Sequence, residues 1–240
     1  MTTVVEVLNR IARECSVSAP SSWVTATTHT HVQIRDDFLL ETIDDMKNRV
    51  NWPSPIGKQT VIAGDGSEDY DLPEDFQGLQ FGETAVYETT TTRRWGVPVV
   101  TDGEWTQLKT LGTGGTNRYY RIKGYDGAHQ ISLYQNPASG SSITVSYVST
   151  NWMADSACTA GSTFTAEDDV LLLPRRPVEL GTIYLWRKSK GFTYGDILAE
   201  YEAWLATQSN RLNGRNTINF GGRHTEKPMR VPVPDFIPSS

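Results

Sequence analysis

The stretch GDGSEDYDLPEDF, Gly64 to Phe76, lies where the chain changes from helical to strand-like patterning, and it is dense in acidic residues. An EF-hand calcium loop needs oxygen ligands at positions one, three and five, a glycine at six and a glutamate at twelve. Counted from Asp65, the three oxygens are present, but position six is Tyr70 and position twelve is Phe76. The spacing therefore argues against a calcium site and favours a polar turn.

Residues on both sides of the Gly-Asp-Gly sequence alternate between apolar and polar, as half-buried strands do. They predict two strands, Gln59–Ala63 and Asp69–Leu72, joined by this turn. We expect Pro73 to end the second strand and Phe76 to return to the core. The acidic side chains then form a solvated edge, suited to an electrostatic contact with a neighbouring protein.

Short alternating runs continue to Tyr147, with glycine-rich or Asn/Asp-containing breaks between them. The predicted strands are Gln59–Ala63, Asp69–Leu72, Thr84–Thr90, Tyr119–Ile122, Gln130–Tyr134 and Ile143–Val148. Strands of this length and spacing predict a small antiparallel sandwich or barrel. A short helix is expected over Asp102–Leu111, and a polar loop over Ala154–Thr165.

Helical patterns flank this region on both sides. A capping box from Thr3 to Glu6 opens a first helix that reaches Cys15, and a second apolar stripe predicts a helix over Asp36–Val50. After the strands come a helix that starts near Pro177 and stops at Gly191, and a helix that follows a capping box from Thr193 to Asp196 and runs to Leu212. The short break between the last two predicts a helical hairpin.

The fold class predicted from this order is α+β. A helical bundle built from N- and C-terminal segments, 1–57 and 153–212, carries an inserted antiparallel β lobe, 58–152, with a sandwich or barrel-like form. The remainder, 213–240, is rich in proline and lacks apolar periodicity, so it is predicted to be an extended C-terminal arm. Apolar residues without a core of their own suggest that the arm docks onto a partner.

Composition excludes several function classes for the 240-residue chain. The net charge of -6 and a pI near 5.3 argue against a general nucleic-acid binder, which is normally basic. No run approaches 18 uncharged apolar residues, and the first fifteen residues lack the apolar segment of a signal peptide, so no membrane contact is expected. Two cysteines, Cys15 and Cys158, permit one disulfide, but two free thiols are the preferred interpretation.

Chemistry-bearing motifs are weak. His29-Thr30-His31 lacks a third metal ligand, and a surface loop is the preferred interpretation. The glycine-rich 111–116 lacks the Gly-Lys-Ser/Thr ending of a phosphate loop, and no Gly-x-Ser-x-Gly elbow is present. We expect no enzyme activity, no cofactor and no metal. Two features stay open as alternatives: a glycan-binding platform of Tyr119, Tyr120, Tyr125, Tyr134 and Tyr147, and a glycosidase acid pair among the 28 acidic residues, whose geometry is tertiary. The acidic run 167–169 is interpreted as the start of a strand or helix.

The candidate binding residues are basic or apolar. Arg175 and Arg176 lie between two prolines at a helix start, where exposed guanidiniums suit the carboxylates of a neighbour, and Arg187 lies in the last turn of the same helix. The anchors expected in the arm are Phe220, Arg223, Met229, Arg230 and Phe236.

Several linked motifs resemble a known family. They are the opening helix 4–13, Val50-Asn51-Trp52-Pro53 after the second helix, Tyr70-Asp71-Leu72-Pro73-Glu74-Asp75-Phe76, Leu133-Tyr134-Gln135-Asn136-Pro137 leading to Ile143–Tyr147 and Trp152, Phe164-x-x-Glu167-Asp168-Asp169 to Leu173-Pro174, and Trp186-Arg187-Lys188-x-Lys190-Gly191 with the Tyr201-Glu202 helix. In order and spacing they resemble the head-to-tail adaptor (connector) proteins of tailed bacteriophages, of the tail tubular protein A or head-completion type.

The resemblance implies a structural virion protein at the head–tail junction, assembled in the host cytoplasm. It implies a homo-oligomeric ring, typically of twelve copies, between the portal protein and the tail nozzle or tail tube protein. The helical part would form the wall of the DNA ejection channel, the β lobe would lie outside, and the arm would bind the portal. An acidic channel would let double-stranded DNA pass without specific binding. The alternatives are a phage tail module that binds or cleaves cell-surface glycan, and another tail-completion protein.

Overall fold

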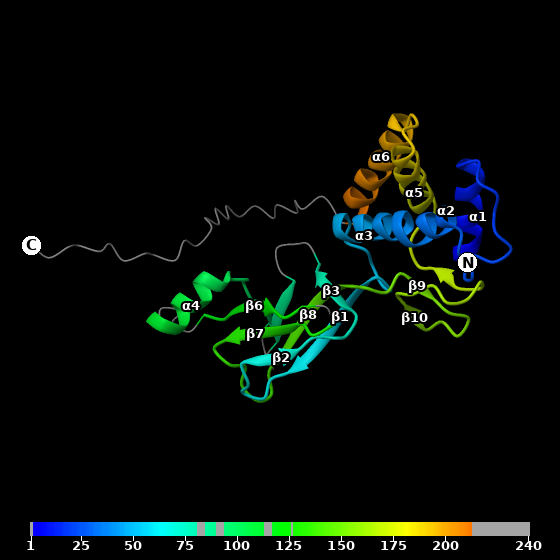
Figure 1. The fold of residues 1–240 in the computed structure, drawn as a ribbon. Coiled ribbons are helices and arrows are strands. Elements are labelled where there is room, and N and C mark those ends of the chain that lie inside the picture. Colours follow the sequence, from blue (N-terminus) through cyan, green and yellow to red (C-terminus); the bar gives the residue numbers. More distant parts are fainter. Residues whose placement is uncertain (1, 81–84, 90–93, 113–116, 126, 213–240) are drawn as a thin grey trace, which may run out of the picture.

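The computed structural model describes residues 2–80, 85–89, 94–112, 117–125 and 127–212. It is an α+β protein in which most helices gather apart from the two larger sheets, while helix α4, Asp102–Leu111, lies at the sheet end (Figure 1). Two clusters of buried apolar residues lie inside it. One contains the helices together with Trp52, Trp152 and Leu173, and the other lies between the strands and contains Phe76 and Tyr147. The division into domains stays a prediction.

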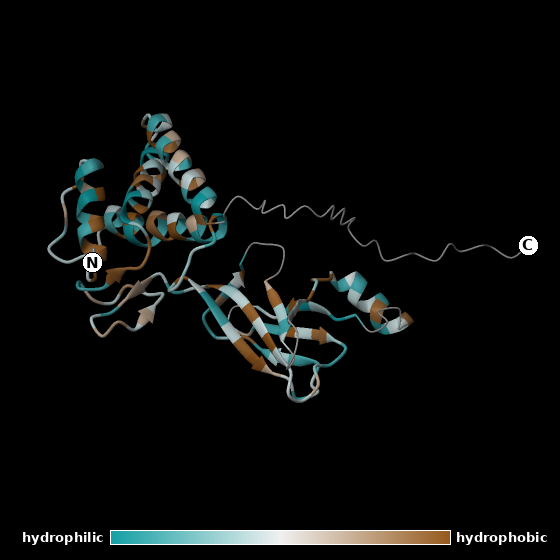
Figure 2. Ribbon diagram, turned by 180° about the vertical axis from the view of Figure 1, so that it is seen from behind, coloured by the Kyte–Doolittle hydropathy of each residue, from teal (hydrophilic) through white to brown (hydrophobic). Residues whose placement is uncertain are grey.

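The helical part combines segments from both ends of the sequence. Its elements are α1 Val4–Glu14, α2 His29–Val32, the π-helical turn η1 Gln33–Phe38, α3 Leu39–Arg49, α5 Arg175–Ser189 and α6 Gly195–Leu212. Helix α5 packs against α1, α3 and α6. Apolar stripes run along these helices and face the shared interior (Figure 2).

Helix ends agree with the sequence in part. The Thr3 hydroxyl accepts a hydrogen bond from the Glu6 amide (3.2 Å), and α5 stops before Gly191, whose φ of 72° is left-handed, as predicted. The capping box predicted from Thr193 is wrong. Helix α6 begins at Gly195, and the Leu198 amide donates to the carbonyl of Tyr194, the residue before the helix.

The second predicted helix begins earlier than expected. Helical structure starts at His29, so the expected surface loop there is replaced by α2. Trp23 holds this start, since its indole ring contacts the His31 ring edge-on at 5.4 Å. The Arg35 guanidinium donates to the carbonyls of Trp23 and Val24, which ties the Ser/Thr-rich segment to the helix.

The strands form three antiparallel sheets, none of which closes into a barrel. The largest contains β1 Gly57–Ala63, β8 Ser142–Ser149, β4 Val86–Thr89 and β5 Arg94–Gly96, with β3 Phe76–Leu79 also paired to β8. The second contains β2 Asp69–Asp71, β7 Gln130–Tyr134 and β6 Tyr119–Lys123, and the third β10 Ala160–Gly161, β9 Met153–Ala154 and β11 Val170–Leu171. Every predicted strand overlaps one of these strands, and the two ends of the predicted Thr84–Thr90 lie outside the described residues.

The predicted hairpin around Gly-Asp-Gly is wrong. Strand β1 pairs with β8 and strand β2 pairs with β7, so the turn carries the chain from one sheet to the other. The polar loop expected over 154–165 contains the end of β9 and all of β10. Helix α4, Asp102–Leu111, is confirmed, and a capping box from Thr101 to Glu104 starts it.

Across the described residues, no helix combines the length and apolar character needed to cross a membrane. Cys15 is buried, Cys158 is exposed, and both are free thiols. Burial raises the pKa of the Cys15 thiol to about 12, which keeps it protonated.

Candidate functional site

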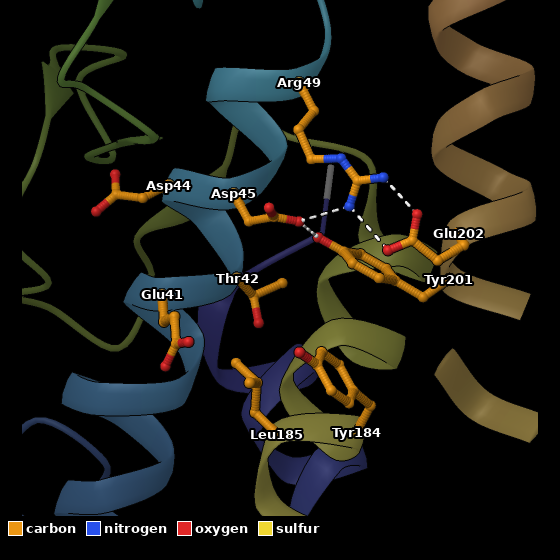
Figure 3. A pocket seen from close by; sticks show the side chains of 9 residues that line it. All are labelled: Glu41, Thr42, Asp44, Asp45, Arg49, Tyr184, Leu185, Tyr201 and Glu202. Atoms are coloured by element: carbon orange, nitrogen blue, oxygen red, sulfur yellow. Dashed lines mark hydrogen bonds and ion pairs between the residues drawn. The ribbon is translucent and has the colours of Figure 1, made fainter. Parts of the chain in front are cut away.

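A pocket of about 670 Å³ opens between α3, α5 and α6 (Figure 3). It is lined by Glu41, Thr42, Asp44, Asp45, Arg49, Tyr184, Leu185, Tyr201 and Glu202. Four of these side chains are carboxylates and one is a guanidinium, so the lining is acidic. The set comes from segments about 140 residues apart in sequence, which the helical packing brings together.

The helices approach closely beneath the pocket because α5 carries a glycine there. A Cβ placed on Gly181 would lie 2.4 Å from the methyl group of Thr42 on α3. The Thr42 hydroxyl donates to the Phe38 carbonyl one turn earlier (2.8 Å), which keeps it bonded although its side chain is buried. Tyr201, also buried, fills the space between α5 and α6.

One wall of the pocket is a hydrogen-bonded network (Figure 3). The Arg49 guanidinium donates to both carboxylate oxygens of Glu202 and to Asp45 Oδ2 (3.2 Å), and the Tyr201 hydroxyl donates to the same Asp45 oxygen (2.7 Å). The hydrogen bonds from Arg49 hold the pKa of Glu202 below its usual range. Burial, followed by the bond to Asp45, raises the pKa of Tyr201. The network therefore joins α3 to α6 with fixed charges.

The other wall carries Glu41 and Asp44 on α3 (Figure 3). The Asp44 carboxylate accepts from Gln77 on β3 (3.3 Å) and lies 3.4 Å from the Lys47 amine. This arrangement can hold an ammonium or guanidinium group through carboxylates and phenol rings. Within the described ranges, no group of three or more His, Cys, Asp or Glu side chains is arranged to hold a metal ion.

The predicted interface arginines lie elsewhere, and two of them already have partners in the chain. Arg175 Nε lies 2.5 Å from Glu179 Oε1, and Arg176 Nη2 lies 2.6 Å from Glu200 Oε1 on α6. Both guanidiniums thus have a partner within the chain, while their side chains stay 36% and 47% exposed, and their part in a subunit interface stays a prediction. Arg187 is half-buried at the end of α5, near enough to Cys15 to lower the pKa of its thiol against the larger effect of burial.

The arm residues Phe220, Arg223, Met229, Arg230 and Phe236 lie outside the described residues, as does the 113–116 part of the glycine-rich loop. Their roles stay predictions.

The five tyrosines of the glycan alternative do not share one exposed surface. Tyr120 and Tyr147 are buried, Tyr119 and Tyr134 contact each other at 6.3 Å, and Tyr125 is 81% exposed. Two of the three carboxylates in 167–169 accept hydrogen bonds from the protein itself. Glu167 accepts from Ser22 and Val24, and the buried Asp169 accepts from two backbone amides in the turn before it.

The acidic stretch 64–76 is more than the solvated edge that was expected. Asp75 is half-buried and accepts hydrogen bonds from Lys58 Nζ (2.6 Å), the Tyr147 hydroxyl (3.0 Å) and Ser149 Oγ (2.6 Å). Burial raises the pKa of Asp75, but the bonds from Lys58, Ser149 and Tyr147 outweigh it, so the pKa is held below its usual range. Asp75 thus binds β1 and β8 together. Phe76 is buried, as predicted.

Sequence reasoning missed Lys47, the buried lysine of α3. Its ammonium donates to the Thr150 carbonyl (3.0 Å), and Thr150 in turn donates its amide to the Asp75 carbonyl (2.8 Å). These bonds join the helical part to the sheet. Burial lowers the pKa of Lys47 against the raising effect of Asp44. The sequence did not indicate that Lys47 is buried, because it lies on an otherwise polar helix face and its hydrogen-bond acceptor is 103 positions away.

No protein-family model and no curated protein matches the chain.

Proposed function

We propose that the chain is a structural adaptor of a tailed bacteriophage, a non-enzymatic subunit of a ring that joins the portal to the tail. The observation that carries this proposal is the order of packing. Helices α1 and α3, from before the strands, pack on α5, from after them, so the β part is inserted into a helical part. That arrangement is the one the resemblance implies.

The motifs that carry the resemblance are packing residues, which also supports the proposal. Trp52 stacks on Trp204 at 6.3 Å between their ring centres, and its indole donates to the Met46 carbonyl. Trp152 and Phe76 are buried in the two clusters. Because these residues build the fold, shared motifs here favour a shared architecture.

In this proposal the helices form a bundle at the ring wall, and the two larger sheets form a sandwich-like lobe outside it. The segment 213–240 binds the portal through its apolar and basic anchors, among them Met229 and Phe236. The acidic pocket between α3, α5 and α6 would receive a basic side chain of an adjoining virion protein. The excess of 28 acidic over 22 basic residues suits a channel through which DNA slides.

The test is the mass of the assembly in solution. The full chain is mixed with the portal protein of the same virus and measured by light scattering and native mass spectrometry. A dodecamer of the 26.7 kDa chain would add about 320 kDa to the portal. A chain that stays monomeric with portal present would rule the proposal out. Electron microscopy of the virion then gives the position and copy number of the subunit.

A matched pair of variants locates the portal contact. Replacing Met229 and Phe236 by aspartate should abolish the added mass while the helical content stays unchanged. The exposed Tyr125→Asp change, on the β part, should leave the added mass intact.

A further inference from the structure

Strand β1 ends the largest sheet with one side unpaired. Within the described strands it pairs only with β8, in the order β1-β8-β4-β5. Two backbone hydrogen bonds flank the pairing of β1 with β8, from the Ser149 amide to the Ile56 carbonyl and from the Gly64 amide to the Ser141 carbonyl. Because the register between them is unbroken, the backbone groups of the even-numbered residues of β1 bond to β8. The amides and carbonyls of Gln59, Val61 and Ala63 therefore point to the open edge.

This edge lacks the usual protection against strand pairing. Edge strands are commonly short, charged, bulged or interrupted by proline. Over 59–63 the sequence QTVIA has no charge and no proline, and its pairing with β8 has no bulge. Val61 is 65% exposed, and Ile62 is only partly covered although it packs on the β cluster. An added strand would bond the free backbone groups and cover both side chains.

We propose that the edge of β1 binds the segment 216–220 of a neighbouring copy of this chain, paired antiparallel as an added strand. The 28 residues after α6 offer this segment, Asn216-Thr217-Ile218-Asn219-Phe220, which is uncharged, as 59–63 is, and alternates polar with apolar residues from Thr217 to Phe220. With Ile218 opposite Val61, two apolar side chains share one face of the sheet.

The charges at the ends of the two segments favour an antiparallel over a parallel added strand. In the antiparallel register, Arg215 lies beside Gly64, next to the exposed carboxylate of Asp65; a parallel strand would place Arg215 opposite Lys58. The segment 213–240 carries four basic and two acidic residues, whereas the rest of the chain carries 18 and 26, so the attraction extends beyond this pair. Phe220 would end the added strand, and the residues from Arg223 onward stay free to reach the portal.

Disulfide trapping between two chains tests the contact. Both carry Cys158→Ser to remove the exposed thiol, and both keep the buried Cys15. One chain carries Val61→Cys and a mass tag, and the other carries Ile218→Cys. Opposed residues of a bonded antiparallel pair have Cα atoms about 5.5 Å apart, within the range that a disulfide spans. After mild oxidation, with and without portal, we expect a mixed dimer about ten times more abundant than with Tyr125→Cys as the partner.

Two results would overturn the inference: no mixed dimer above the Tyr125→Cys control in either condition, or a link that forms only within one chain carrying both cysteines. A second variant is independent of thiol chemistry. In Val61→Pro the lost amide points to the open edge, so the β1–β8 ladder keeps its bonds. The contact between β1 and the segment 216–220 of a neighbouring copy should be lost, while the urea unfolding midpoint changes little. Ring mass without the 61–218 link would refute only the edge contact, whereas absence of any assembly would refute the adaptor function.

Discussion

Asp75→Ala tests the hydrogen-bonded carboxylate that joins β1 to β8. Alanine removes a carboxylate that accepts from Lys58, Tyr147 and Ser149 and leaves three donors without it. A hydrogen bond to a charged group contributes about 1.5–3 kcal/mol and a neutral one about 1 kcal/mol. The Lys58 side chain is 31% exposed, so water replaces part of its bond. We therefore expect a loss of about 3 kcal/mol in the free energy of unfolding.

The assay is urea unfolding followed by tryptophan fluorescence and circular dichroism at pH 7. Glu74→Ala is the matched control, because Glu74 is the exposed acidic neighbour in the same stretch. It should change the free energy of unfolding by less than about 0.5 kcal/mol. An Asp75→Ala loss as small as that of the control would show that the three bonds are not net stabilising.

The pH dependence gives a second check on the same residue. The pKa of Asp75 is lower in the folded chain than its unfolded value of about 3.9. Its stabilisation is therefore fully present above that unfolded value and is lost as the pH falls through the folded pKa. The unfolding free energies of wild type and Asp75→Ala should differ most near neutral pH and converge in acid. Curves that stay parallel down to pH 2 would contradict the bonded carboxylate.

Three further predictions use other parts of the chain. Gly181→Ala should lower the free energy of unfolding by about 2 kcal/mol, because the new Cβ meets a threonine methyl on α3. Gly103→Ala on α4 is the control: its Cβ meets nothing within 4 Å, so it should be neutral or stabilising. Equal urea midpoints for the two variants would refute the tight contact. A thiol reagent at pH 8 should modify Cys158 at once and Cys15 only after unfolding, and fast modification of both would contradict the burial of Cys15. Burial lowers the pKa of Lys47 in the folded chain. Between that pKa and the unfolded value of about 10.4 the unfolded chain binds more protons, so the free energy of unfolding of the wild type should rise with pH. Lys47→Met should lack this rise, and matching pH profiles of the two proteins would refute the prediction.

Local periodicity predicted the elements well and their pairing poorly. The stripe of α1, the stop of α5 at Gly191 and the core strands are visible because helix and strand patterns are local. The partner of β1 is β8, and their paired residues are 79 to 91 positions apart, from Ala63 with Ser142 to Gly57 with Val148. Nothing in the Gly-Asp-Gly turn distinguishes this from pairing with β2. The two-residue strands β9, β10 and β11 are too short to show alternation.

The early start of the second helical segment has a tertiary cause. Residues 25–30 are rich in threonine, which disfavours helices, and no strong cap follows. The helix forms from His29 because Ile34 is fully buried and Arg35 bonds to the carbonyls of Trp23 and Val24. Packing overrides propensity here, so a window of sequence places the helix start too late.

The intrachain partners of Arg175 and Arg176 differ in how far the sequence alone could have predicted them. Glu179 lies four residues after Arg175, a spacing at which opposite charges meet on one helix face, so that pair was visible in principle. Glu200 reaches Arg176 only because the hairpin folds α6 back on α5, and the acidic pocket likewise depends on helices from both ends of the chain. When a site is assembled from distant segments, the local sequence around each of its charged residues does not distinguish it from an ordinary surface charge. The open edge of β1 shows in the sequence only as a run without charge or proline, and its place at the end of the sheet depends on pairing with the distant strand β8. Trapping at Val61 is therefore a more direct test of the edge contact than replacing a charged residue.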